Sequence, residues 1–218
     1  MVYRLLAAFL ASFAISAHAV TFSSTQFNVD AVALSDAAPD FQSASSPTAL
    51  VTASAASVAN NNAATAGAIA GPFLFTTSAD ASATGGIASA VSTAHFLGSF
   101  VNAAHMLLGL DFLRTDVLSG TGGGSTTLFV TLKSGATTIF DDFITGSRAF
   151  DYLASVGSTS TLELTLSSDA SAGFLGTGPG NSSSFGLVEI TAPVPEPETY
   201  LLFAIGLAAI GAARRRKA

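Results

Sequence analysis

The chain has 218 residues, of which 10% are charged, and it contains neither cysteine nor tryptophan. Without cysteine it forms no disulfides, and both thiolate catalysis and cysteine-based metal sites are excluded. All but two of the 14 acidic residues lie between residues 20 and 192, where Arg114, Lys133 and Arg148 are the only basic residues, which leaves about nine negative charges in excess. Nucleic-acid binding requires clustered lysine and arginine to neutralise phosphates, so this composition argues against it.

The first 19 residues have the three parts of a secretory signal peptide. Arg4 supplies a short basic region, an apolar run follows from Leu5 to Ile15, and Ala17 and Ala19 form a small-x-small cleavage site. This order predicts export of the chain, with cleavage after Ala19. The body that remains, residues 20–192, has the length of one domain with a sizeable core.

The first half of the body is predicted to form strands with small side chains. Residues 25–34 alternate between apolar and polar side chains, which is typical of a half-buried strand. Residues 44–94 are rich in Ala, Ser, Thr and Gly, a composition that is also found in disordered segments. Apolar residues recur through this segment and favour short strands, with one helix over residues 47–59 and turns at residues 60–62 and 85–86.

The second half of the body gives clearer strand signals. The apolar run at residues 105–113 predicts a central strand buried on both faces, and the glycine-rich residues 120–125 predict a flexible loop. Four further strands are predicted at residues 126–133 and 137–144, which form a hairpin, and at residues 159–167 and 185–191. Many short strands joined by Gly/Ser turns predict a mainly β fold, an antiparallel β-sandwich that is jelly-roll-like.

The densest acidic point of the body is Asp141 next to Asp142. Together with Asp151, or with Asp111 and Asp116, these carboxylates offer the oxygen ligands that Ca²⁺ prefers. The chain has no D-x-D-x-D-G-type loop, and solvated acids at the end of a strand are the alternative interpretation. The two aspartates are therefore a weak candidate for a calcium site.

Other catalytic and cofactor signals are weak. His95 and His105 are the only histidines of the body, too few for a zinc site without cysteine. The chain lacks a G-x-S-x-G nucleophile elbow, and residues 120–125 lack the G-K-[ST] ending of a phosphate loop. Glycoside hydrolysis needs two carboxylates across a cleft, and the sequence does not single out any pair. We predict no enzyme activity and no cofactor.

Residues 193–218 contain a proline-rich spacer (193–198), an apolar run (199–213) and a basic end (214–218). The residues that carry these signals are Val194, Pro195, Glu196 and Pro197 in the spacer and Arg214, Arg215, Arg216 and Lys217 in the basic end. As a helix, the apolar run would span roughly 22 Å, short of the bilayer core of about 30 Å, but long basic side chains extend its reach. The positive-inside rule places the basic end in the cytoplasm and the body on the other side.

This ordered tail resembles the PEP-CTERM sorting signal of exported proteins in Gram-negative bacteria. The resemblance implies recognition by an exosortase, a membrane-embedded transpeptidase-like enzyme, after export through the secretion translocon. It also implies removal of the membrane helix and delivery to the cell surface or the exopolysaccharide matrix. A permanent membrane anchor without processing is the alternative. The same kind of tail is also known as an ice-binding-protein C-terminal domain, a label that describes the tail and not the activity of the body.

These signals together predict an exported protein of the cell surface or extracellular matrix. Its expected role is structural or adhesive, in a biofilm or exopolysaccharide. A glycan-binding module is the first alternative, although sugar-binding surfaces usually use Trp and Tyr, and the aromatic residues here are mostly Phe. A glycan-active hydrolase is the second alternative.

Overall fold

The computed structural model describes residues 21–36, 39–103, 105–173 and 178–191. These residues contain twelve strands and no helix. The strands are β1 (Phe22–Leu34), β2 (Asp40–Ser46), β3 (Val51–Ala59), β4 (Asn62–Ala70), β5 (Leu74–Ala83), β6 (Ala88–Val101), β7 (His105–Gly120), β8 (Gly123–Ser134), β9 (Thr137–Ile144), β10 (Arg148–Leu153), β11 (Thr159–Ala172) and β12 (Gly180–Thr191). Among the described residues there is no apolar helix of the length that a membrane crossing needs.

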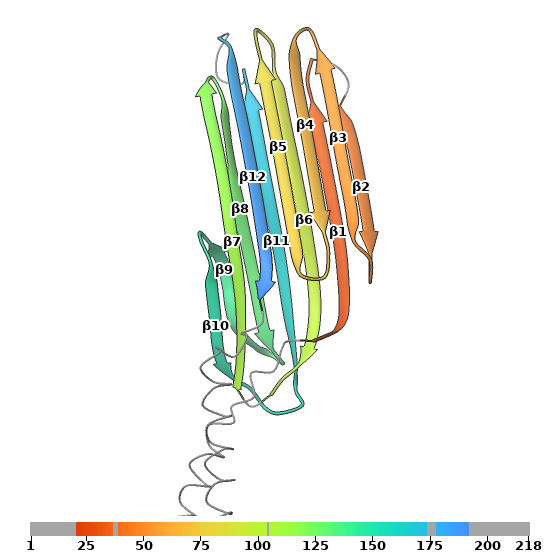
Figure 1. The fold of residues 1–218 in the computed structure, drawn as a ribbon, viewed down its shortest axis with the longest axis vertical. Coiled ribbons are helices and arrows are strands. Elements are labelled where there is room, and N and C mark those ends of the chain that lie inside the picture. The colour runs from red at the N-terminus through yellow and green to blue at the C-terminus, as the bar shows by residue number, and fades with distance from the viewer. Residues whose placement is uncertain (1–20, 37–38, 104, 174–177, 192–218) are drawn as a thin grey trace, which may run out of the picture. The chain divides into compact units, whose positions relative to one another are not determined.

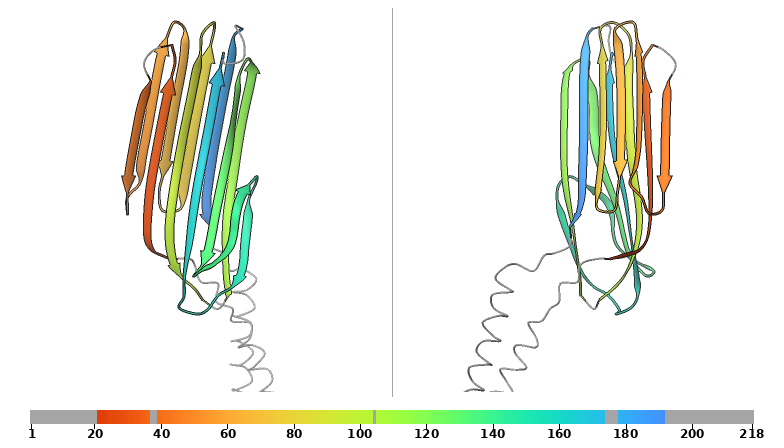
Figure 2. Two further views of the ribbon diagram at one scale, coloured as in Figure 1. Left: turned by 180° about the vertical axis from the view of Figure 1, so that it is seen from behind. Right: turned by 45° about the vertical axis from the view of Figure 1, so that its right-hand side comes forward.

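The strands form two six-stranded antiparallel sheets that face each other (Figures 1 and 2). The first sheet has the order β2-β1-β6-β11-β8-β9, and the second has the order β10-β7-β12-β5-β4-β3. Most strands alternate between buried and exposed side chains, as expected where one face of a sheet meets the other sheet and the opposite face meets solvent. The exceptions are β2, β9 and the second half of β7, where few or no side chains are buried. The predicted mainly β, antiparallel architecture is confirmed, and the jelly-roll likeness stays a prediction.

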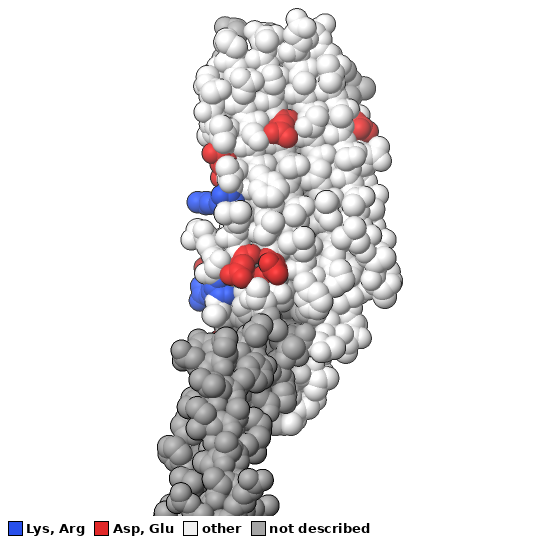
Figure 3. All heavy atoms as spheres, in the orientation of Figure 1, with Lys and Arg blue, Asp and Glu red and all other residues white. Residues whose placement is uncertain are grey.

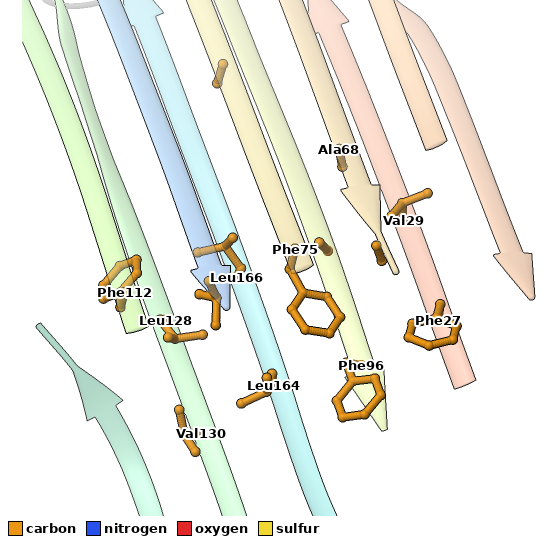
Figure 4. Packing of buried hydrophobic residues seen from close by; sticks show 14 of the residues in the cluster. Phe27, Val29, Ala68, Phe75, Phe96, Phe112, Leu128, Val130, Leu164 and Leu166 are labelled. Atoms are coloured by element: carbon orange, nitrogen blue, oxygen red, sulfur yellow. The ribbon is translucent and has the colours of Figure 1, made fainter. Parts of the chain in front are cut away.

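The interior has two zones that differ in side-chain size. The first zone contains large apolar side chains, among them Phe27, Phe75, Phe96 and Leu164, all at most 2% exposed (Figure 4). In the second zone, toward the other end of the same strands, the buried side chains are mostly Ala and Ser, for example Ala31, Ala33, Ala64, Ala66, Ala79, Ala81, Ala88, Ala90, Ala170 and Ala172. Small side chains leave little space between two sheets, so the second zone requires a close approach of their backbones.

Buried hydroxyl groups in this second zone fall into two kinds. Ser168 on β11 lies between Thr77 and Thr126, with Oγ–Oγ1 distances of 2.8 Å and 3.1 Å, so its hydroxyl joins the two sheets. Within the described part of the chain, the hydroxyls of Ser92, Ser182 and Ser184 are buried without a hydrogen-bond partner. Burial without a partner costs free energy, because the hydroxyl loses its hydrogen bonds to water.

The two kinds of serine predict opposite effects of the same substitution. Ser184→Ala removes an unsatisfied hydroxyl and is expected to raise the free energy of unfolding by about 1 kcal/mol. Ser168→Ala leaves Thr77 and Thr126 without their shared partner and is expected to lower it by about 1–3 kcal/mol. Urea denaturation of both variants measures the difference, and a loss of stability in Ser184→Ala would contradict the first expectation.

Several predicted elements are confirmed by the strand boundaries. Residues 25–34 lie in β1, and residues 126–133 and 137–144 form the β8–β9 hairpin. Residues 159–167 lie in β11 and residues 185–191 in β12. The predicted turn at residues 60–62 joins β3 and β4, and Asn60 and Asn61 have φ angles of 49° and 63°. Both angles lie in the left-handed region that asparagine tolerates and that a tight hairpin turn needs.

Three predictions about local structure are wrong. Residues 47–59 contain no helix but the strand β3, because alternate alanines pack on the facing sheet and this burial outweighs the helix propensity of alanine. The run at residues 105–113 lies in β7 and is buried on one face only, since the outer face of the second sheet has no covering layer among the described residues. Residues 120–125 are not a flexible loop throughout, because β7 ends at Gly120 and β8 begins at Gly123, which leaves only a short turn at residues 121–122.

Candidate functional site

The predicted sorting and processing residues lie outside the described residues. They are Ala17, Ala19, Val194, Pro195, Glu196, Pro197, Arg214, Arg215, Arg216 and Lys217. The apolar run at residues 199–213 lies outside as well. Candidate sites in the structure are therefore those of the body, on the two outer sheet faces.

The weak calcium candidate does not form a cluster. Asp141 and Asp142 follow each other on β9, where the Asp141 carboxylate accepts a hydrogen bond of 2.7 Å from Thr131 and the Asp142 carboxylate accepts one of 2.7 Å from the backbone N–H of Phe143. Asp151 lies on β10, which belongs to the other sheet. The described residues hold no group of three Asp, Glu or His side chains placed for a metal ion. The structure thus gives the calcium hypothesis no support.

The two histidines of the body lie in different sheets, each beside an acid. His105 on β7 pairs through Nε2 with Asp151 on the neighbouring β10, at the solvent-exposed surface. His95 on β6 pairs through Nε2 with the Glu163 carboxylate on β11, at 3.0 Å. Both are cross-strand pairs between diagonal neighbours. Because β6 and β7 belong to different sheets, the two histidines do not share a metal site.

A polar row crosses the outer face of the first sheet at the level of His95. Asn28 on β1 donates from Nδ2 to His95 Nδ1 over 3.4 Å, and His95 contacts Glu163 through its other ring nitrogen. Because an amide nitrogen only donates, this arrangement assigns the ring proton of the neutral imidazole to Nε2, which donates to Glu163. Beside the row lies an open hollow lined by Asn28, Asp30, Ser43, Ala44, Ser45 and His95.

The outer face of the second sheet carries a second hollow, of about 300 Å³, over four neighbouring strands. Pairing of the strands places Thr65, Asp80, Ser183 and Val117 in one row across the sheet. The adjacent row consists of Ala63, Ser82, Asn181 and Ser119. Most of these side chains are small and end in a hydroxyl, amide or carboxyl group, and the surface around them carries few charges (Figure 3).

The chemistry of the two hollows is that of hydrogen bonding. The hollow of the second sheet contains one carboxylate, Asp80, and that of the first sheet contains one, Asp30. Neither has the pair of carboxylates that glycoside hydrolysis requires, and neither is lined by an aromatic ring other than the imidazole of His95. Sequence reasoning missed both surfaces, because their residues come from distant segments that only the strand register brings into rows.

At the β2–β3 edge, an aspartate links the two sheets. Asp40 on β2 accepts a hydrogen bond of 3.0 Å from the backbone N–H of Ala56 on β3 and one of 3.2 Å from the Gln42 side chain. These two hydrogen bonds hold the pKa of Asp40 below its usual 3.8, because both stabilise the charged carboxylate. The bond from the Ala56 N–H has the larger effect, and the bond from the Gln42 amide has the smaller one.

The lowered pKa of Asp40 predicts how this link depends on pH. Its contribution to stability is fully present above about pH 3.8, the value in the unfolded chain, and is lost as the pH falls through the lower folded pKa. The amide resonance of Ala56 is therefore expected to titrate with a midpoint below 3.8, and this titration is expected to vanish in Asp40→Asn. Asp30→Asn is the matched control that leaves the titration unchanged. A midpoint at or above 3.8 would contradict the expectation.

Comparison with known proteins identifies the tail and not the body. Residues 193–217 match the family model of the PEP-CTERM protein-sorting motif. The match confirms the resemblance found in the sequence and includes its spacer and its basic end. Searches among curated proteins and among solved structures gave no match.

Proposed function

We propose, from the PEP-CTERM protein-sorting motif that this chain carries at residues 193–217, that it is a non-enzymatic exported protein with a structural or adhesive role in a biofilm or exopolysaccharide. Residues 1–19 direct export through the translocon, and residues 199–213 hold the chain in the inner membrane until an exosortase processes it. The protein is then delivered to the cell surface or the extracellular matrix. The motif by itself suggests export and sorting by an exosortase. The proposal for the role after sorting is based on the structure of the body.

The outer faces of the body support a structural or adhesive role. Both outer faces carry polar rows that include Ser, Thr and Asn, as in the rows through Asp80 and through His95, and exposed apolar side chains such as Val91 and Leu97 lie between them. Flat surfaces of this kind suit many weak, partly water-mediated hydrogen bonds to a hydroxyl-rich polymer, and do not suit the enclosure of one small substrate. The excess of acidic residues keeps such a surface soluble and disfavours attachment to anionic lipids.

The sorting part of the proposal is tested in the tail. In the double variant Pro195→Ala/Glu196→Ala, the exosortase signal is removed while the apolar run and the basic end remain. The unprocessed chain is expected to accumulate in the inner membrane, and the mature form is expected to disappear from the surface and matrix fractions. Fractionation followed by mass determination measures both, with Glu198→Ala as the control that is processed normally. Unchanged processing of the double variant would refute exosortase sorting.

A second candidate function, glycan binding, is favoured by the hollow of the second sheet. Asp80 and Thr65 lie there side by side, with Thr65 Oγ1 at 3.5 Å from Asp80 Oδ2, and Asn181 and Ser183 follow on β12. These groups present donors and acceptors at the spacing of neighbouring strands, so a sugar polymer would be held along the row, across the strands.

Binding of the organism's own polysaccharide separates the two functions. If the hollow binds glycan, Asp80→Ala with Thr65→Ala should lower affinity about tenfold or more, since hydrogen bonds to a charged group contribute about 1.5–3 kcal/mol. Asp169→Ala, on the outer face of the first sheet, is the matched control. Affinity electrophoresis in gels that contain the polysaccharide measures the change, and equal retention of all variants would reject the hollow as a glycan site.

A further inference from the structure

One long stretch of strand edge in the second sheet has no paired strand on its open side among the described residues. β10 pairs with β7 only from His105 to Leu110, so β7 has a strand on one side alone, β12, from Asp111 to Gly120. Figure 1 shows β7 at the margin of the sheet, extending well beyond β10. Leu113, Val117 and Leu118 on this stretch are 58%, 60% and 50% exposed. An edge of this length with exposed apolar side chains is a template for another strand.

The backbone groups available on this edge follow from one hydrogen bond. The N–H of Phe112 donates to Ser147 Oγ at 3.2 Å, on the side away from β12. In an antiparallel ladder the N–H and C=O of one residue point to the same side, and the side alternates along the strand. Arg114, Asp116 and Leu118 therefore direct their N–H and C=O groups toward the open side, and Leu113, Thr115 and Val117 direct theirs toward β12.

We propose that a second copy of this chain pairs with the edge, β7 against β7, antiparallel and centred on Thr115. In this register Arg114 of each copy lies opposite Asp116 of the other. The two pairs that flank Thr115 therefore each join opposite charges. On the outer face, Leu113 of each copy lies opposite Val117 of the other. On the inner face, Leu118 lies opposite Phe112, whose N–H is already bonded to Ser147 Oγ, so this pair marks each end of the ladder.

No neighbouring register gives the same complementarity. Centring the pair on Arg114 places two arginines opposite each other, and centring it on Asp116 places two aspartates opposite each other. Registers displaced by one residue bring groups that point to β12 opposite groups that point outward, so the ladder cannot form. The centred register thus pairs the free backbone groups of Arg114 with those of Asp116 and joins opposite charges, and like-charge repulsion disfavours the alternatives.

The two charges explain why the edge selects its own copy. Inward-pointing charges on an edge strand usually prevent a foreign strand from pairing, because they would be buried without a partner. Here the side chains of Arg114 and Asp116 point to the inner face. Arg114 Nη1 lies 3.5 Å from the carbonyl oxygen of Thr126, and the Thr126 hydroxyl donates a hydrogen bond of 3.0 Å to the Asp116 carboxylate. A second copy supplies the opposite charge at both positions. Because the contact is two-fold symmetric, it uses the edge of both copies and ends at a dimer.

Disulfide trapping tests the register directly, since the chain has no cysteine of its own. Thr115 lies on the proposed two-fold axis in a non-hydrogen-bonded pair, with Cα atoms about 4.5 Å apart, within the range of a disulfide. Full-length Thr115→Cys, exported in cells, is expected to run mostly at the dimer mass on a non-reducing gel and at the monomer mass after reduction. Thr65→Cys, exposed on β4 of the same face, is the control and is expected to stay monomeric.

Charge exchange tests the partner. Arg114→Asp alone and Asp116→Arg alone each place like charges in both pairs, and each should raise the dimer dissociation constant about tenfold or more. A mixture of the two variants restores both pairs and should form heterodimers about as stable as the wild-type dimer, as should the double exchange with itself. Sedimentation of the purified full-length chains in detergent measures these constants.

Three outcomes would overturn the proposal. They are a monomeric Thr115→Cys variant, equal cross-linking of Thr115→Cys and Thr65→Cys, and single charge variants whose mixture does not form heterodimers. Recovery in the mixture also shows that each single variant is folded. The charge-exchange readout uses purified chains and does not depend on export, on sorting or on the role in the matrix, so the dimer and the proposed function can fail separately.

Discussion

Replacing Phe96 by alanine is expected to lower the free energy of unfolding by about 3–5 kcal/mol. The Phe96 side chain is fully buried, and its ring lies 5.1 Å from Phe22, 5.5 Å from Phe27 and 5.2 Å from Phe75, measured between ring centroids. These rings come from both sheets, since β5 belongs to the second sheet and β1 and β6 to the first. Removal of the ring at their centre leaves a cavity that neither sheet can close.

Phe41→Ala is the matched control for this substitution. Phe41 lies on β2, and its side chain is 64% exposed, so the same truncation is expected to change stability by no more than about 0.5 kcal/mol. Urea denaturation of the two variants measures the contrast. A loss below 1.5 kcal/mol for Phe96→Ala, which is about half the expected minimum, would show that the aromatic zone is not the centre of the core.

Gly124→Ala is expected to lower the free energy of unfolding by about 1–3 kcal/mol, although it adds one methyl group only. A Cβ atom at Gly124 would lie 2.7 Å from Ser182 Oγ and 2.9 Å from Ser184 Oγ, and it would also collide with the carbonyl oxygen of Asp169. Ser182 and Ser184 belong to β12 in the facing sheet, so the methyl group would have to push the two sheets apart at this point.

Gly146 offers the opposite case. A Cβ atom there would meet nothing within 4 Å, and the backbone of Gly146 does not have a positive φ angle. Gly146→Ala is therefore expected to be neutral or to raise stability by about 0.4–1 kcal/mol through the unfolded chain. Thermal unfolding followed by circular dichroism compares both variants. Equal stability of Gly124→Ala and the wild type would show that the sheets can move apart at no cost.

Phe96→Ala and Gly124→Ala both test what stabilises the fold of a chain without cysteine. No disulfide is available, so stability depends on the packing of two sheets. The large aromatic zone contributes apolar burial, and the Ala/Ser zone contributes close packing of backbones. A sandwich of this kind can present two wide faces that carry rows of polar side chains, which is the property on which the proposed structural or adhesive role rests.

The strands that were predicted correctly are those with strong local signals. Alternation with a period of two over residues 159–167, and a turn of Ser and Gly between residues 126–133 and 137–144, need no distant contacts to be recognised. The predicted helix at residues 47–59 is wrong because there the local signal and the distant contacts favour different structures. Alanine favours a helix locally, and only the facing sheet, which buries Ala53 and Ala55, makes a strand the better choice.

The sequence by itself determined the sorting signal of this protein, its acidic and cysteine-free body, and its strand-rich class, because these depend on residues that are close together in the chain. The tertiary structure decided which residues share a surface. The rows through His95 and Asp80 and the open edge at Thr115 all depend on strand register. Register is set by long-range pairing and by the burial of one face, and residues more than 60 positions apart, such as Asn28 and His95, become neighbours only in the folded sheet.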